Sequence, residues 1–172
     1  LLNPDVAGQM NVFPAANGTL NFTVTQPDGT TMDVVPAGGS LAGMSSAAAD
    51  IAEQRAEVDA LATKFAELIN SSQAAGRTKA GAAGAPLVDI GAGGALTIVA
   101  LDVGVDTIAT ADNTAENANL LALNEARRNS GIESGWTAIV SNHAQKVQSA
   151  KLVQESSQSR SEAADEARDQ LS

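Results

Sequence analysis

The chain has 172 residues and a formal net charge of −10, from ten Lys and Arg against twenty Asp and Glu. This balance argues against nucleic-acid binding, which needs clustered Lys or Arg. The absence of cysteine excludes disulfides and thiolate metal sites. No run of about 18 apolar residues is present to cross a bilayer. Apolar residues make up 44% of the chain but aromatic residues only 2%, and an alanine-rich core favours closely packed helices.

Residues 1–39 have the alternation of a β-hairpin region. Leu20, Phe22 and Val24 alternate with polar residues, and a second alternating run follows the turn at 27–29, which is Pro-Asp-Gly. Because an isolated hairpin is only marginally stable, its apolar face is expected to pack on another element.

Residues 45–75 have the period of a long helix. Ile51, Val58 and Phe65 lie seven residues apart, with Leu61 and Leu68 between them. The helix is predicted to end at the glycine in position 76. The glycine-rich segment 76–94 is predicted to be a loop, followed by a short strand within 96–100.

Two further helices are predicted towards the end of the chain. Asn113 and Glu116 have the spacing of a capping box that opens a helix over 117–127. Ser134 is predicted to cap the last helix, which continues without Gly or Pro from 136 to 172. We expect this helix to pack lengthwise on the helix through 51–69, with Trp136 buried between elements. The predicted fold is mainly α with a small β part: a long-helix bundle over 40–172, with a Gly-rich loop and short strand at 76–101, plus the β-hairpin region.

Candidate chemical motifs fail on their spacing. The segment 76–81 has the glycine spacing of a phosphate loop, but Ala82 stands where the lysine is required. The three aspartates at 102, 106 and 112 lack the alternating oxygen ligands of a calcium site. Ser40 and the single histidine, His143, are the only candidates for a serine hydrolase, and His143 falls on the apolar stripe of the last helix. The sequence therefore predicts a protein that is not an enzyme, with no catalytic residue, metal or cofactor.

A longer pattern covers residues 38–172. The segment Leu61–Asn70 is followed by Gln73, by glycines at 76, 81 and 84, and by the apolar pair at 87–88. The leucines at 120, 121 and 123 and the Gly135-Trp136 start of the last helix continue it in order. In order and spacing this pattern resembles hook-associated protein 1, the family that joins the hook of the bacterial flagellum to the filament. Gln73 and Thr78 stand where the family often has His and Asp.

The resemblance implies a flagellin-like core domain that acts by self-assembly, as a ring at the distal end of the hook. It also implies that the β-hairpin region over 1–39 is part of a variable outer subdomain. It implies contacts with hook protein, with the second junction protein and with copies of itself, and an export chaperone for the full-length protein. It also implies an extracellular location in the flagellum, reached without a cleaved signal peptide. The residues expected to serve packing and backbone roles are Ile51, Val58, Leu61, Phe65, Leu68, Ile69, Asn70, Gly76, Gly81, Gly84, Leu120, Leu123, Trp136 and Val140.

The resemblance also implies that the chain is a central fragment. The family's two terminal assembly segments lie outside residues 1–172, and the first residue is not Met. We therefore expect this chain by itself to be monomeric, as its acidic charge favours.

Three alternatives stay open. Flagellin or another filament or junction protein has similar long helices, and a secreted coiled-coil adhesin or translocator has the same acidic helical character. A small hydrolase that uses Ser40 and His143 is the enzymatic alternative.

Overall fold

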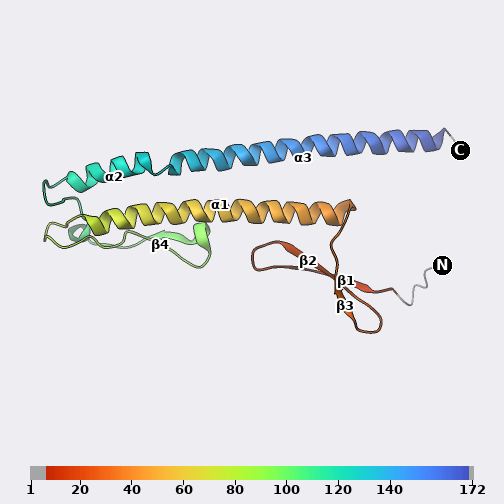
Figure 1. The fold of residues 1–172 in the computed structure, drawn as a ribbon, viewed down its shortest axis with the longest axis horizontal. Coiled ribbons are helices and arrows are strands. Elements are labelled where there is room, and N and C mark those ends of the chain that lie inside the picture. The colour runs from red at the N-terminus through yellow and green to blue at the C-terminus, as the bar shows by residue number, and fades with distance from the viewer. Residues whose placement is uncertain (1–6, 171–172) are drawn as a thin grey trace. The chain divides into compact units, whose positions relative to one another are not determined.

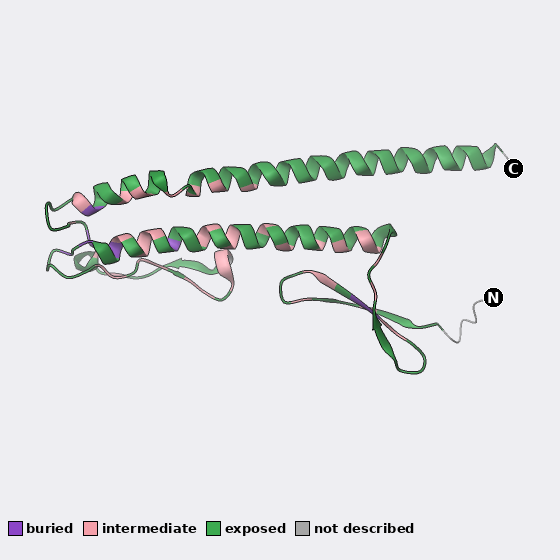
Figure 2. Ribbon diagram, viewed as in Figure 1, coloured by how far each residue is buried: buried purple, intermediate pink, exposed green. Residues whose placement is uncertain are grey.

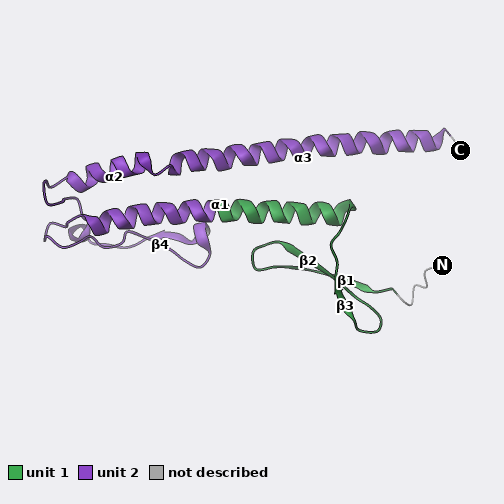
Figure 3. Ribbon diagram, in the orientation of Figure 1, with its two compact units in different colours: residues 1–57 green, residues 58–172 purple. Residues whose placement is uncertain are grey.

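A computed structural model describes residues 7–170. The chain is mainly helical with a small β part, as predicted, and the β part forms two antiparallel sheets. The order of the elements can be followed in Figure 1. It divides into two compact units, residues 1–57 and 58–172 (Figure 3). The boundary lies inside the long helix α1 (Gly39–Ala75), whereas composition changes near residue 39.

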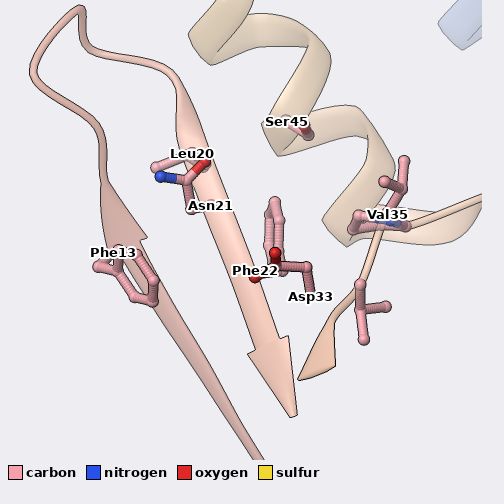
Figure 4. Close-up of a pocket in the computed structure, with 9 residues that line it drawn as sticks. Phe13, Leu20, Asn21, Phe22, Asp33, Val35 and Ser45 are labelled. Carbon is pink, nitrogen blue, oxygen red and sulfur yellow. The ribbon is translucent and has the colours of Figure 1, made fainter. Parts of the chain in front are cut away.

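The first unit contains a three-stranded antiparallel sheet in the order β1-β2-β3. Its strands are β1 (Gln9–Pro14), β2 (Leu20–Thr25) and β3 (Thr31–Asp33). The predicted hairpin corresponds to β2 and β3, and β1 adds a third strand. In the β1–β2 register Val12 lies opposite Phe22, so apolar side chains share one face of the sheet. Phe22 is 4% exposed, and its ring points towards α1 beside Ser45 (Figure 4).

The start of α1 meets this sheet through small residues. Half-buried small residues spaced three or four apart are Ala42, Ser45, Ala48 and Ala52, and Leu41 is half-buried beside them. Ala52 contacts the first hairpin, since its Cβ lies 3.9 Å from the position that a Cβ would take at Gly18. Ser45 also lines a hollow together with Leu20 and Phe22 of β2.

The second unit contains the end of α1, a two-stranded sheet and two further helices. Strands β4 (Val88–Ile90) and β5 (Ile98–Ala100) pair antiparallel, and the 3₁₀ helices η2 (Gly94–Thr97) and η3 (Val105–Thr107) flank β5. Helix α2 (Ala118–Asn129) is followed by α3 (Ile132–Asp169). The predicted loop at 76–94 therefore contains a strand, and the predicted strand begins at Ile98 because Leu96 belongs to η2.

Two predicted helix caps are wrong. The N-cap position of α2 is Asn117, while Asn113 accepts a hydrogen bond from Arg77 Nε at 2.6 Å. Helix α3 begins two residues before Ser134, after Gly131, whose φ of +73° is left-handed. Ser134 Oγ instead donates a hydrogen bond to the Gly131 carbonyl at 3.0 Å. In both places the side chain that the capping pattern selected makes a different hydrogen bond.

The core is small. Within residues 7–170, the buried apolar residues are Phe22, Ala66 and Ala109. Every residue of α3 from Val140 to Asp169 is exposed (Figure 2). The prediction that Trp136 is buried is wrong, because its side chain is 53% exposed. The start of α3 does approach α1, since Leu61 Cδ1 lies 3.0 Å from where a Cβ would stand at Gly135.

Candidate functional site

The best-built site in the chain is a set of polar side chains on one face of α1 that hold the segment 84–119. We call Asp59, Asn70 and Gln73 the α1 clasp. These positions differ by 11 and 3 residues, so they lie on one side of the helix, together with the buried Ala66. Each accepts a hydrogen bond from the backbone of a different part of the segment.

Asn70 fixes the start of β4. Its Oδ1 accepts hydrogen bonds from the backbone N–H groups of Leu87 at 2.9 Å and Val88 at 3.2 Å. Its Nδ2 donates to the Val88 carbonyl at 2.7 Å. An amide side chain can bind both the N–H and the carbonyl of one residue, as the backbone of a neighbouring strand would. Asn70, which the sequence singled out, thus connects α1 to the small sheet.

Gln73 fixes the chain after η3. It is 2% exposed, and its Oε1 accepts a hydrogen bond from the Ala109 N–H at 2.9 Å. The backbone carbonyl of Gln73 also accepts from Gly84 N at 3.0 Å. Because Ala109 is fully buried, this N–H depends on the glutamine for its partner.

Asn119, at the start of α2, completes the connection from the other side. Its Nδ2 donates to the carbonyls of Ala109 at 2.7 Å and Ser72 at 3.1 Å. Asn119 is 6% exposed. Hence the end of α1, the buried loop at Ala109 and the first turn of α2 are joined by one buried polar network.

Two of the predicted glycines make room for this network. A Cβ at Gly76 would overlap the side-chain amide of Asn119 and stand 2.9 Å from Ala109 Cβ. A Cβ at Gly84 would stand 2.6 Å from Ala109 Cβ and 2.7 Å from Gln73 Oε1. Gly81 has a different role, since it has a left-handed φ of +83° and open space around it.

Asp59 completes the clasp at η2. Its Oδ1 accepts a hydrogen bond from Ala95 N at 2.6 Å, and Gly94, with φ of +66°, lies against the carboxylate. Neither Asp59 nor Asn119 was predicted from the sequence. Asp59 lies on the same helical face as Asn70 and Gln73, and this face also carries the buried Ala66. A polar residue there needs a hydrogen-bond partner, and this position could have identified Asp59 as part of the site.

The neighbouring face of α1 is apolar and borders an open groove. Phe65, Leu68 and Ile69 line it from α1, and Leu120 and Leu123 line it from α2. Phe65 also lines a second hollow with Val58, Leu61, Ile132 and Trp136. Large parts of this surface are open to water, with Phe65 40% and Leu120 45% exposed. Together the two hollows are lined by eight of the ten apolar residues predicted to pack.

The remaining predicted packing residues are exposed. Ile51 belongs to the first unit and is 67% exposed, and Val140 is 49% exposed on α3. Val147 continues the exposed apolar stripe of α3 seven residues after Val140, whereas Val153 lies about 120° around the helix from Val147.

The candidate chemical residues are dispersed. Ser40 is exposed in the first turn of α1 in the first unit, and His143 is exposed on α3 in the second. Within the described residues, no three His, Asp or Glu side chains gather closely enough to hold a metal ion. Among the same residues, no helix is long and apolar enough to cross a bilayer.

A hollow in the first unit carries a few polar groups. Asn21, Asp33 and Ser45 line it beside the rings of Phe13 and Phe22 (Figure 4). A carboxylate, an amide and a hydroxyl on such a wall can donate and accept hydrogen bonds.

Comparison with protein-family models, with curated proteins and with solved structures gave no match to this chain.

Proposed function

We propose that this chain is the central part of a structural protein of the bacterial flagellum, a junction protein that connects hook to filament by self-assembly. The proposal starts from the order and spacing of residues over 38–172, which resemble hook-associated protein 1. The contacts of Asn70, Gly76 and Gly84 support it, because all three residues belong to this pattern. Asn70 is part of the α1 clasp, and the two glycines leave room for the side chains packed beside it. Their roles are structural, as self-assembly without catalysis would require.

The observation that carries the proposal is the exposed apolar surface of α3 and of the groove beside α1. Trp136, Val140 and Val147 lie at helical spacing and are each about half exposed. Exposed apolar patches of this kind mark interaction sites. We propose that in the assembled flagellum these residues become buried in a long-helix bundle, and that the partners are hook protein, the second junction protein and further copies of the same protein.

Localisation tests the proposal directly. Antibodies raised against this chain should label the hook–filament junction of the source bacterium in immunogold electron microscopy. Deletion of the gene should leave hooks without attached filaments. Filaments that stay attached in the deletion strain, or labelling elsewhere, would contradict the proposal.

A pair of substitutions tests the proposed surface. Val140→Glu with Val147→Glu, made in the full-length protein, places charge on the exposed stripe of α3, since the two residues are seven apart. Filament attachment should be lost while the helical circular dichroism of the protein is kept. Ser149→Glu is the matched control, because it adds charge on the opposite side of the helix and should leave attachment normal. Attached filaments in the double variant would remove α3 from the interface.

A further inference from the structure

The turn between β1 and β2 contains an Asn-Gly pair that is open to solvent. Ala15 N donates to the Thr19 carbonyl at 2.8 Å, and Gly18 N donates to the Ala15 carbonyl at 2.9 Å. Asn17 and Gly18 are exposed, and Gly18 has a φ of +90°. With no side chain on Gly18, its backbone nitrogen is approached without steric obstruction.

The side chain of Asn17 is held by two donors from one residue. Its Oδ1 accepts hydrogen bonds from Thr19 N at 3.1 Å and from Thr19 Oγ1 at 2.8 Å. Both donors withdraw electrons from the amide carbonyl and would stabilise negative charge that develops on Oδ1. Paired donors aimed at such an oxygen lower the barrier to attack on a carbonyl carbon.

We propose that Asn17 is a site of intramolecular deamidation assisted by Thr19. The Gly18 backbone nitrogen loses its proton to water and attacks Asn17 Cγ, which forms the N–Cγ bond of a succinimide. The Cγ–Nδ2 bond then breaks, and ammonia leaves with a proton taken from water. A second water opens the ring at Cγ to give aspartate, or at the backbone carbonyl carbon to give isoaspartate, in which the chain runs through Cγ. The net change is one amide and one water converted to one carboxylic acid and one ammonia.

The second turn of the same sheet provides an internal comparison. Gln26 N donates to the Thr30 carbonyl at 2.8 Å, Gly29 N donates to the Gln26 carbonyl at 2.9 Å, and Thr30 N donates to Asp28 Oδ1 at 2.9 Å. The two turns therefore have the same backbone hydrogen bonds and differ in one side chain, which is the amide of Asn17 in the first turn and the carboxylate of Asp28 in the second. An ionised carboxylate resists nucleophilic attack, and the backbone hydrogen bond from Thr30 lowers the pKa of Asp28, so it stays ionised at neutral pH.

The aspartate product is compatible with this turn, because Asp28 already accepts the equivalent backbone bond. The isoaspartate product is not equivalent, since it adds one carbon to the backbone between the paired residues Ala15 and Thr19. Deamidation at Asn17 therefore adds one negative charge in both outcomes, and in the isoaspartate outcome it also disturbs the β1–β2 hairpin.

The test is peptide mapping by mass spectrometry of the folded chain during incubation at neutral and mildly alkaline pH. Asn17 should convert at least about tenfold faster than Asn70. The amide of Asn70 is held on α1 by three hydrogen bonds. The rate should rise with pH, because the attacking nitrogen must lose its proton. Conversion of Asn17 no faster than that of Asn70 would overturn the proposal.

Substitution of Thr19 tests the assistance. Thr19→Ala removes the hydroxyl donor and should slow conversion by about tenfold, the effect expected for one hydrogen bond to a charged oxygen. Thr19→Ser keeps the hydroxyl and should convert at the original rate. Circular dichroism of each variant checks that the chain is folded. Equal rates in Thr19→Ala and Thr19→Ser would overturn the role of Thr19.

Discussion

Gln73 Oε1 and the backbone N–H of Ala109 are joined by a 2.9 Å hydrogen bond across 36 residues of sequence, and both residues are buried. This bond satisfies a backbone group that is closed to water, so its loss has a direct cost.

Replacement of Gln73 by Met should therefore destabilise the chain by about 1–3 kcal/mol, the usual cost of an unsatisfied buried donor. Met keeps the length of the side chain and removes the acceptor. The free energy of unfolding is measured by urea denaturation. Gln148→Met, on the exposed surface of α3, is the matched control and should change stability by less than about 0.5 kcal/mol. Equal stability of the two variants would show that Ala109 N–H finds another partner.

Two glycine-to-alanine changes should have opposite signs. At Gly84 the new Cβ would stand 2.6 Å from Ala109 Cβ, so Gly84→Ala should destabilise by roughly 1–3 kcal/mol through overpacking. At Gly43, inside α1, the space around the Cβ position is open, so Gly43→Ala should stabilise the helix by about 0.5–1 kcal/mol. Thermal melts followed by helical circular dichroism compare them. A tolerated Gly84→Ala would mean that the loop at Ala109 shifts freely.

Trp136 should behave as a solvent-exposed residue in this chain. It is the one tryptophan, so its fluorescence reports this site alone. Its emission should be quenched readily by acrylamide, and Trp136→Ala should cost about 1 kcal/mol, roughly half the value for a fully buried large side chain. Strong protection from acrylamide would mean that a partner covers the start of α3 in solution.

The turn before α2 should weaken in acid. Side-chain and backbone hydrogen bonds from Thr114, with a further one from Ala115 N, lower the pKa of Asp112. A group whose pKa is lower in the folded state stabilises the fold above its unfolded pKa of about 3.9, and this contribution is lost as pH falls through the folded pKa. Carboxyl NMR titration should give a midpoint below 3.9. Asp112→Asn keeps an acceptor oxygen and should retain more of the turn than Asp112→Ala; identical behaviour would contradict this role.

The tail of α3 should exchange its amide hydrogens fastest among the helices. Residues 156–169 are exposed throughout, whereas the end of α1 carries the clasp. Helical segments without buried contacts open at low free energy. Hydrogen exchange detected by mass spectrometry compares these segments, and light scattering over a range of concentrations checks the expected monomer. Strong protection through 156–169, or an oligomer at every concentration, would mean that the tail has a partner.

Local signals predicted much of the secondary structure. Alternation placed β2, and the turn at 27–29 marked where β3 follows. The end of α1 was predicted from Gly76, whose N–H closes the last turn on the Ser72 carbonyl at 3.1 Å. These features depend on neighbouring residues alone, so one sequence is sufficient to find them.

Features that depend on distant residues were missed. Strand β4 pairs with β5, and Asn70, 18 residues earlier, binds the backbone of its first residue, Val88. Asn113 accepts a hydrogen bond from Arg77, 36 residues away, and does not cap α2. The burial of Trp136 was predicted from an apolar stripe, but periodicity identifies a face of a helix without showing what covers it. Of the site, Asn70 and Gln73 were named from the sequence, and Asp59 shares their helical face, whereas the contacts of Asn119 are not revealed by spacing.

The position of the boundary within α1 limits how the chain can be dissected. No glycine or proline lies between residues 44 and 75, so the helix is continuous through positions 57 and 58. A cut there would create two new helix ends, each with about four backbone groups left without helical partners. Limited proteolysis should therefore spare this boundary and begin at exposed non-helical segments such as 79–83. A shortened expression clone that keeps either unit intact has to include the whole of α1.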